Sequence, residues 1–319
     1  MGHTAVIFPG QGAQTVGMGR DVFEASAAAR GVFKDANRIL GFDLAEICFH
    51  GPAERLNATD VSQPAIFVTS AAIWAALRER PETADAVVPQ ATAGLSLGEY
   101  TALWLAGSLG FEDALRLVHD RGRFMQAAAE ARNGVMVSVL GLNRSRIDEV
   151  LEAAAGPGVL VAANYNSPAQ TVLSGDTDAC DRAIHAVDRL GGRAVRLRVA
   201  GAFHSPLMQP AADRLREVLA ATNVATPGIP VVSNVSAEYH RGPDEIRRLL
   251  ETQVTQSIHW HASIERLVRD GYDRFVEVGP GRVLTGLMRN INRGVQTINV
   301  STAATLRKLA ESMAVETTG

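Results

Sequence analysis

The sequence predicts an α/β protein in which a small domain is inserted into a large domain built on a parallel sheet. Three observations support this class. Short apolar segments alternate with helical segments over the first part of the chain and again after about residue 230. Between these parts the order of elements changes to βαββαβ, the order of a ferredoxin-like unit. In the first part, Gly94-Leu95-Ser96-Leu97-Gly98 joins a strand to a helix, as in hydrolase-like α/β folds.

The first part of the large domain contains two predicted strands. Residues 5–8 are apolar and end at Pro9 and a glycine-punctuated loop, and residues 91–93 are small and run directly into Gly94. Apolar residues recur with helical spacing in four further segments, at residues 20–40, 64–78, 97–106 and 111–131. Strands separated by helices favour a parallel sheet with both faces covered.

The middle of the chain has the ferredoxin-like order. Strands are predicted at residues 136–140, 159–163, 170–173 and 194–199, and helices at residues 145–155 and 176–190. Such a unit folds as a compact module. We therefore expect a ferredoxin-like small domain at residues 134–199 and a discontinuous hydrolase-like catalytic domain formed by residues 1–133 and 200–319.

The α/β pattern resumes in the last part of the chain. Strands are predicted at residues 230–233, 274–278 and 296–300, and helices near residues 247–250 and from residue 283 onward. These elements complete the parallel sheet of the large domain.

Composition excludes several classes of protein. The chain has 319 residues, of which 46% are hydrophobic and 20% charged, an ordinary globular composition. We expect a cytoplasmic protein, because no apolar stretch approaches the ~18 residues of a membrane helix and the N-terminus does not resemble a signal peptide. The net charge of −3 gives no reason to expect nucleic-acid or membrane binding. Two cysteines without metal-ligand spacing predict neither a disulfide framework nor a metal site.

Ser96 is the candidate nucleophile. A serine at a sharp strand-to-helix turn exposes its hydroxyl at the carboxyl edge of the sheet, and the following helix points its first amides at the site. The pattern is short, and chance matches are common in a chain with 29 glycines. The strand before Gly94 and the helix after Ser96 favour the catalytic interpretation.

A serine nucleophile needs a general base, usually histidine. His204 is the most suggestive of eight histidines, because it follows a strand and lies among small residues in a loop. The others have ordinary structural interpretations; they are His3, His50, His119, His185, His240, His259 and His261. In hydrolase folds an acid lies between the serine and the histidine, and no Asp or Glu from residue 97 to 203 stands out.

Six segments form a specific pattern along the chain. They are Phe8-Pro9-Gly10-Gln11-Gly12-Ala13-Gln14, Gly94-Leu95-Ser96-Leu97-Gly98-Glu99-Tyr100, Arg121-Gly122-Arg123-Phe124-Met125-Gln126, Asn164-Tyr165-Asn166-Ser167-Pro168, Gly201-Ala202-Phe203-His204-Ser205-Pro206-Leu207-Met208 and Glu277-Val278-Gly279-Pro280-Gly281. Each segment is moderately specific, and their order and spacing are very specific. Together they resemble the malonyl-CoA:acyl-carrier-protein transacylase family over essentially the whole chain.

The resemblance implies a two-step exchange of a malonyl group between two thiols. Ser96 takes the group from malonyl-CoA with His204 as general base, and the phosphopantetheine thiol of holo acyl carrier protein then takes it from Ser96. The family places an oxyanion hole at the backbone amides of Gln11 and Leu97. Its histidine is oriented by a backbone carbonyl, here near Gln253, instead of an acid. No cofactor is implied, and a monomer is expected.

The resemblance also assigns the residues that select the substrate. Arg121 meets the free carboxylate of the malonyl group, which would cost several kcal/mol to bury unpaired and which a bidentate arginine satisfies. About ten residues into its helix, Arg121 can reach back over Ser96. Phe203 fits a pattern for malonyl over methylmalonyl groups, and Asn164 and Asn166 match a segment that lines the site.

Two departures from the family pattern and three alternatives remain. Leu95 replaces a histidine common in the family, and residues 254–258 lack an asparagine-proline pair often found there.

The motifs do not distinguish fatty-acid synthesis from a free-standing polyketide-synthase acyltransferase. A serine thioesterase is disfavoured by Arg121 and the missing acid, and a non-catalytic binding protein by the number of matched loops.

Overall fold

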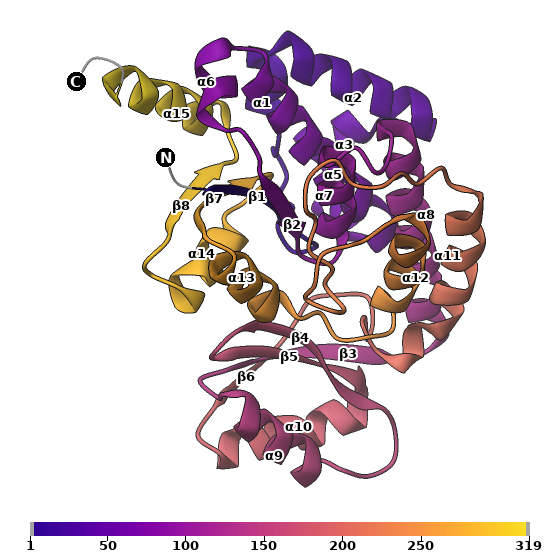
Figure 1. Cartoon of the computed structure of the whole chain (residues 1–319). Coiled ribbons are helices and arrows are strands. Elements are labelled where there is room, and N and C mark those ends of the chain that lie inside the picture. The colour runs from indigo at the N-terminus through magenta and orange to yellow at the C-terminus, as the bar shows by residue number, and fades with distance from the viewer. Residues whose placement is uncertain (1–2, 317–319) are drawn as a thin grey trace.

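The computed structural model describes residues 3–316 and contains two sheets in two bodies (Figure 1). The large body carries a four-stranded sheet in the order β2-β1-β7-β8. All neighbouring strands in it are parallel, as predicted. Its strands are β1 (His3–Phe8), β2 (Ala91–Gly94), β7 (Tyr272–Val278) and β8 (Gln296–Val300).

β1 shows why this sheet lies between two layers of helices. Successive side chains of a strand point to opposite faces. Val6 and Phe8 join the larger hydrophobic cluster, whereas Ala5 and Ile7 join a second cluster on the other face. All four are buried, so residues 5–8 of the strand are apolar on both faces and do not alternate with polar residues.

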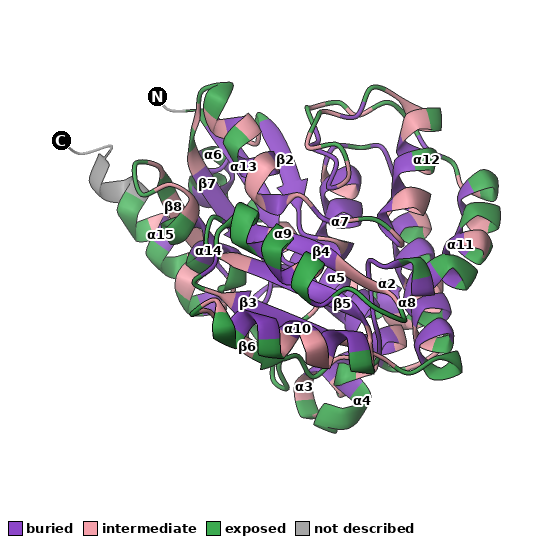
Figure 2. Ribbon diagram, turned by 90° about the horizontal axis from the view of Figure 1, so that it is seen from below, coloured by how far each residue is buried: buried purple, intermediate pink, exposed green. Residues whose placement is uncertain are grey.

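The helices of the large body cover both faces of this sheet (Figures 1 and 2). In the larger cluster, the long helices α5 and α8 pack against one another, and each contributes more buried apolar residues than any other helix. The helices of this body are α1 (Arg20–Ala25), α2 (Ala27–Leu40), α3 (Leu44–His50), α4 (Ala53–Asn57), α5 (Thr59–Arg78), α6 (Pro81–Ala86), α7 (Leu97–Leu105), α8 (Phe111–Ala131), α11 (Gln209–Ala221), α12 (Pro243–Gln253), α13 (Trp260–Arg269), α14 (Val283–Ile291) and α15 (Ala303–Glu316), with a 3-10 turn at Pro206–Met208.

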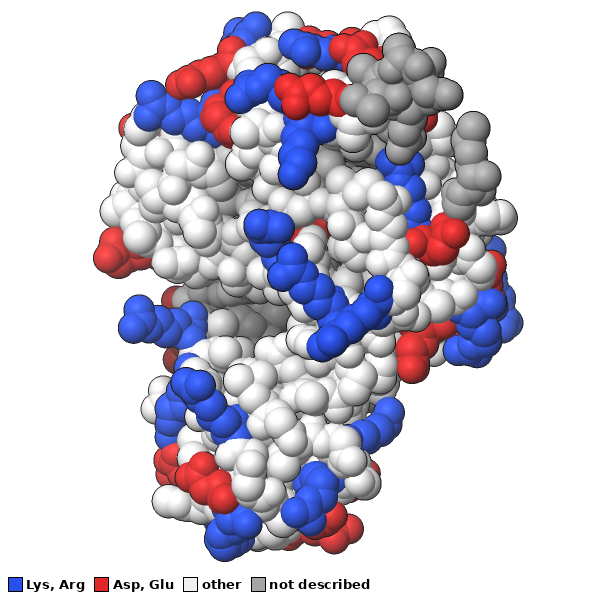
Figure 3. All heavy atoms as spheres, turned by 90° about the vertical axis from the view of Figure 1, so that its left-hand side faces the viewer, with Lys and Arg blue, Asp and Glu red and all other residues white. Residues whose placement is uncertain are grey.

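The small body has the ferredoxin-like connectivity that the sequence predicts. Its antiparallel sheet has the order β4-β5-β3-β6, and one hydrophobic cluster lies between that sheet and its two helices. The elements are β3 (Gly134–Leu140), α9 (Arg144–Ala153), β4 (Leu160–Ser167), β5 (Gln170–Asp176), α10 (Thr177–Arg189) and β6 (Arg193–Arg196). We accordingly propose that residues 134–199 form the small domain and that residues 1–133 and 200–319 form the large one. The surface is hollowed between the two bodies (Figure 3).

The predicted strand at residues 230–233 is wrong. Val231 and Val232 make only isolated bridges, to Thr92 and Tyr239 respectively. Pro230 has no N–H to donate, and the chain turns directly after Val232, where the Ala237 amide donates to the Ser233 carbonyl over 2.9 Å. The segment therefore touches the edge of β2 without extending the ladder.

The predicted helix at residues 20–40 is two helices. Ser26 between them is extended, with φ −129° and ψ 129°, and its hydroxyl accepts from the Ala29 amide as the N-cap of α2. Pro64 lies inside α5 instead of starting it. Six further helices were not predicted from the sequence; they are α3, α4, α6, α11, α13 and α15. Among the described residues, no helix is long and apolar enough to span a membrane.

Glu277 at the carboxyl end of β7 fixes the start of α14. Its buried carboxylate accepts hydrogen bonds from the amides of Leu284 and Thr285, both over 2.9 Å, and from the Thr285 hydroxyl over 2.5 Å. These amides belong to the first turn of the helix and have no acceptor within it. One buried carboxylate thus ties the sheet to α14.

We expect Glu277→Ala to lower the free energy of unfolding by about 3 kcal/mol, because several buried donors lose their acceptor. Urea unfolding followed by circular dichroism measures this loss. Glu265→Ala is the control, because its side chain is 57% exposed, and it should change stability by less than about 0.5 kcal/mol. Equal losses in the two variants would contradict the capping role.

Candidate active site

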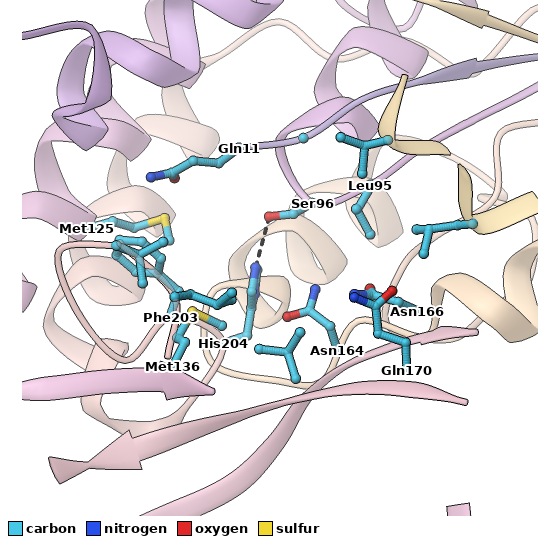
Figure 4. Close-up of a pocket in the computed structure, with 16 residues that line it drawn as sticks. Gln11, Leu95, Ser96, Met125, Met136, Asn164, Asn166, Gln170, Phe203 and His204 are labelled. Atoms are coloured by element: carbon cyan, nitrogen blue, oxygen red, sulfur yellow. Dashed lines mark hydrogen bonds between the residues drawn. The ribbon is translucent and has the colours of Figure 1, made fainter. Parts of the chain in front are cut away.

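A cavity of about 170 Å³ lies where the two bodies meet (Figure 4). The large body contributes the loop after β1, the turn after β2, and His204, while the small body contributes β3, β4 and β5. Its lining includes Gly10, Gln11, Leu95, Ser96, Met125, Met136, Asn164, Asn166, Gln170, Val172, Phe203, His204, Val283 and Leu287. The site is therefore assembled from segments distant in the sequence.

Ser96 occupies a strained turn between β2 and α7. Its backbone has φ 52° and ψ −106°, in the left-handed half of conformational space, which non-glycine residues rarely adopt. A Cβ atom on Gly94 would collide with the backbone of Gly98, and one on Gly98 would collide with the Phe8 carbonyl. Both glycines of the pattern are thus required by the close approach of backbone segments.

Asn234 holds this turn from outside the motif. Its side-chain oxygen accepts from the Ser96 amide over 2.6 Å, and its side-chain nitrogen donates to the Gly94 carbonyl over 2.8 Å. The two hydrogen bonds bracket the strained residue and offset part of the cost of its conformation.

His204 lies beside the hydroxyl of Ser96. Its Nε2 is 2.9 Å from Ser96 Oγ (Figure 4), and its Nδ1 is 2.7 Å from the backbone carbonyl of Gln253. Because a carbonyl only accepts, Nδ1 carries the proton and Nε2 is left to accept from the serine. Burial, together with the charge of Arg121, lowers the pKa of His204 to about 3, so the ring is neutral near pH 7.

Arg121 reaches Ser96 from within the core, at 1% exposure. Its Nη2 donates to Ser96 Oγ and to Gln253 Oε1, both over 3.0 Å, and its Nη1 donates to Gln63 Oε1 over 2.6 Å. The guanidinium also lies over the ring of Tyr100, 5.4 Å from its centroid. All of these partners are neutral, so the cation next to the hydroxyl is suited to pair with an anionic ligand group.

We propose that the backbone amides of Leu97 and Gln11 form the oxyanion hole. Leu97 is the first residue of α7, so its N–H has no acceptor within the helix and lies at the positive end of the helix dipole. Gln11 lies across the cavity in the loop after β1 (Figure 4). Gly10 allows this loop to approach, since a Cβ atom there would collide with the Leu95 carbonyl.

The remaining predicted residues line the cavity. Asn164 and Asn166 project from β4, and Phe203 is buried beside His204 (Figure 4). Among the described residues, Asn166 Oδ1 is buried without a hydrogen-bond partner. Such an atom is available to a ligand donor. No group of three or more His, Cys, Asp or Glu in the described chain is placed to hold a metal ion.

Four residues of the site were not identified from the sequence. Gln63 and Asn234 contact Arg121 and Ser96, while Glu99 and His240 form a buried pair behind them. Glu99 lies within residues 97–203, where no acid was singled out from the sequence, and it contacts Gln253 and not His204. Its position immediately after Gly98, in the first turn of a buried helix, was the available signal.

Comparison with known proteins shows the same fold and family. The acyl transferase domain family matches residues 5–314. A malonyl CoA-acyl carrier protein transacylase of Bacillus subtilis is 38% identical over 318 residues, which is 99% of each chain. The crystal structure of the Clostridium perfringens transacylase superposes with a TM-score of 0.93 at 38% identity, covering 99% of this chain and 98% of that one.

A third similar protein was solved as a complex. It is a malonyl-transacylase bound to its type II polyketide-synthase acyl-carrier protein, with a TM-score of 0.93 at 37% identity, covering 97% of this chain and 99% of that one. These relatives match both bodies, not the catalytic body alone.

The neutral state of His204 predicts an unusual pH dependence. Its pKa lies near 3 in the folded protein, so the ring stays able to accept a proton as the pH falls through 6.5, where ordinary histidines become charged. Phosphonylation of Ser96 by a neutral fluorophosphonate should keep its rate from about pH 8 to about pH 5. Mass spectrometry of the adduct measures the rate, with His204→Ala as the unreactive control. A loss centred near pH 6.5 would contradict the assignment.

Proposed function

The chain belongs to the acyl transferase domain family, and we propose that it transfers a malonyl group from malonyl-CoA to the phosphopantetheine thiol of holo acyl carrier protein in fatty-acid biosynthesis. The observation that carries this proposal is the buried, cationic Arg121 within 3.0 Å of the Ser96 hydroxyl. A serine with a histidine base performs acyl transfer, and a cation beside it selects an acyl group that ends in a carboxylate.

In the first half-reaction, Ser96 Oγ attacks the thioester carbonyl of malonyl-CoA as His204 Nε2 takes its proton. The amides of Gln11 and Leu97 stabilise the tetrahedral oxyanion. When the carbon–sulfur bond breaks, the coenzyme A thiolate takes the proton from His204. The products are malonyl-Ser96 and free coenzyme A.

The second half-reaction reverses these steps with a different thiol. His204 removes the proton of the carrier's thiol, whose sulfur attacks the ester, and Ser96 Oγ leaves with the proton from His204. One thioester is exchanged for another, so the reaction needs no cofactor and follows ping-pong kinetics.

The geometry gives each remaining residue a role in this proposal. The Gln253 carbonyl holds the ring of His204 with Nε2 toward the serine. Phe203 restricts the space beside His204 and disfavours a branched acyl group. Asn164 and Asn166 offer amide groups from β4 to the acyl-thioester chain.

The alternatives receive less support. A thioesterase would deliver the acyl group to water and would not need the Arg121 site, and a binding protein would not need the strained Ser96 turn. Similar full-length proteins are named transacylases of acyl carrier protein, which favours this reaction over a dedicated polyketide role. We further propose that the chain acts as a monomer in the cytoplasm, since one chain supplies the whole site and its two cysteines are buried free thiols.

Incubation with malonyl-CoA alone should add one malonyl group to the protein, on Ser96, because the first half-reaction does not require the carrier. Intact-mass measurement and peptide mapping locate the adduct, and Ser96→Ala is the control. A malonyl group on another residue, or none, would refute the acyl-serine mechanism.

Arg121→Ala should lower kcat/KM for malonyl-CoA by about 100-fold while changing kcat/KM for acetyl-CoA by less than about threefold, because only malonyl presents a carboxylate to the guanidinium. Steady-state transfer to holo carrier protein measures both values. Arg121→Lys, which keeps the charge but loses the bidentate geometry, should fall between. Equal losses for the two substrates would exclude Arg121 as the carboxylate anchor.

A further inference from the structure

A carboxylate is buried three residues after the nucleophile. Glu99 lies in the first turn of α7, and its side chain and that of His240 are both 0% exposed. Glu99 Oε1 is 2.7 Å from His240 Nε2, while Oε2 accepts from the Asn234 amide over 3.0 Å and from Gln253 Nε2 over 2.6 Å. Three N–H groups therefore converge on two oxygens, as they do around an ionised carboxylate.

Glu99 fixes which way the side-chain amide of Gln253 faces. The NH₂ group of Gln253 donates to Glu99, so its oxygen faces the opposite way and accepts from Arg121 Nη2 over 3.0 Å. A flipped amide would place its oxygen against the carboxylate and its NH₂ group against the guanidinium, which are two repulsive contacts. Through Gln253, Glu99 therefore holds Arg121.

A second set of contacts leads from Glu99 to the nucleophile. The Asn234 amide is held by Glu99, and the Asn234 side chain accepts from the Ser96 amide and donates to the Gly94 carbonyl. Gln253 Nε2 also lies 3.1 Å from the Ser96 carbonyl. A single carboxylate thus supports the strained turn and the cation beside it.

His240 completes the pair as a hydrogen-bond donor. Its backbone amide is fixed by the Val231 carbonyl over 2.9 Å. Because a carboxylate oxygen accepts, Nε2 is the ring atom that donates to Glu99. The Nδ1 of the same ring is buried without a hydrogen-bond partner among the described residues. The ring therefore contributes one hydrogen bond to Glu99 and holds that carboxylate in place.

We propose that Glu99, held by His240, is a positioning residue that orients Gln253 and Asn234, and through them Arg121 and Ser96. It touches neither the reacting atoms nor the acyl group. It acts through the position of its carboxylate, which depends on the length of the side chain. Because the proposal concerns the site for the malonyl carboxylate, its selectivity readout rests on the proposed function.

Two substitutions distinguish the effect of the position of the Glu99 carboxylate from the effect of its charge. Glu99→Asp keeps the charge but withdraws the carboxylate by one methylene, so the hydrogen bond to Gln253 is lost. Glu99→Gln keeps an oxygen toward Asn234 and Gln253, and its NH₂ group can donate to a His240 ring that has moved its proton to Nδ1. The malonyl-to-acetyl ratio of kcat/KM should fall about tenfold or more in the Asp variant and stay within about threefold of wild type in the Gln variant.

Leu77→Ala is the matched control for lost stability, because Leu77 is fully buried in α5 away from the cavity. It should lower Tm yet keep the wild-type substrate ratio. A wild-type ratio in Glu99→Asp would overturn the proposal. An equal fall in Glu99→Asp and Glu99→Gln would overturn it too, because the position of the side-chain oxygens, which the Gln variant keeps, would then not account for the effect.

A second readout does not depend on the acyl group. Glu99→Asp should slow phosphonylation of Ser96 by a neutral fluorophosphonate about tenfold, because the Asn234 contacts to the turn loosen, and Glu99→Gln should not. If the wild-type protein takes up no malonyl group, the proposed function fails alone. The assignment of Glu99 then stands on this rate, and an unchanged rate in the Asp variant would overturn it.

Discussion

A guanidinium at 1% exposure must be solvated by the protein, and the residues around Ser96 provide that solvation. Arg121 on α8 is reached by Gln63 from α5, by Gln253 from the end of α12, and by the ring of Tyr100 from α7. Side chains from the helices around α8 therefore also surround its buried cation. Removing any contact leaves a buried charge less satisfied, which costs more than the contact itself contributes.

In the proposed function, this buried charge links substrate selection to the basicity of His204. Arg121 is one cause of the low pKa of His204, so in the empty site the histidine is a weak base. In the proposed function, a malonyl carboxylate bound to Arg121 offsets that charge and removes this part of the lowering, while burial, the larger cause, still lowers the pKa of His204. An acyl group that ends in a carboxylate would therefore leave His204 a stronger base than an acyl group without one.

The sequence predicts the parts of the site that depend on local pattern. The Ser96 turn follows from glycine spacing between a strand and a helix, and the order of the small domain follows from alternating periodicities. Glu99 could not be assigned a role in this way, because its partners Asn234, His240 and Gln253 lie 135, 141 and 154 residues away. Segments such as residues 230–233 have the composition of a strand, yet their pairing depends on the neighbouring sheet edge, which sequence pattern does not specify.

The segment after Gln253 also determines how the two bodies meet. The Ile258 amide donates to the Ala163 carbonyl over 2.8 Å and the Tyr165 amide to the Ile258 carbonyl over 2.9 Å, so this segment pairs locally with β4. The ring of His259 stacks on Tyr165, with centroids 5.4 Å apart. Two carbonyls within six residues thus have different roles. The Gln253 carbonyl holds His204, and the Ile258 carbonyl positions β4 with its cavity-lining asparagines. Both contacts are made by the backbone, which explains how residues 254–258 can depart from the asparagine-proline pattern while the Gln253 carbonyl still orients His204.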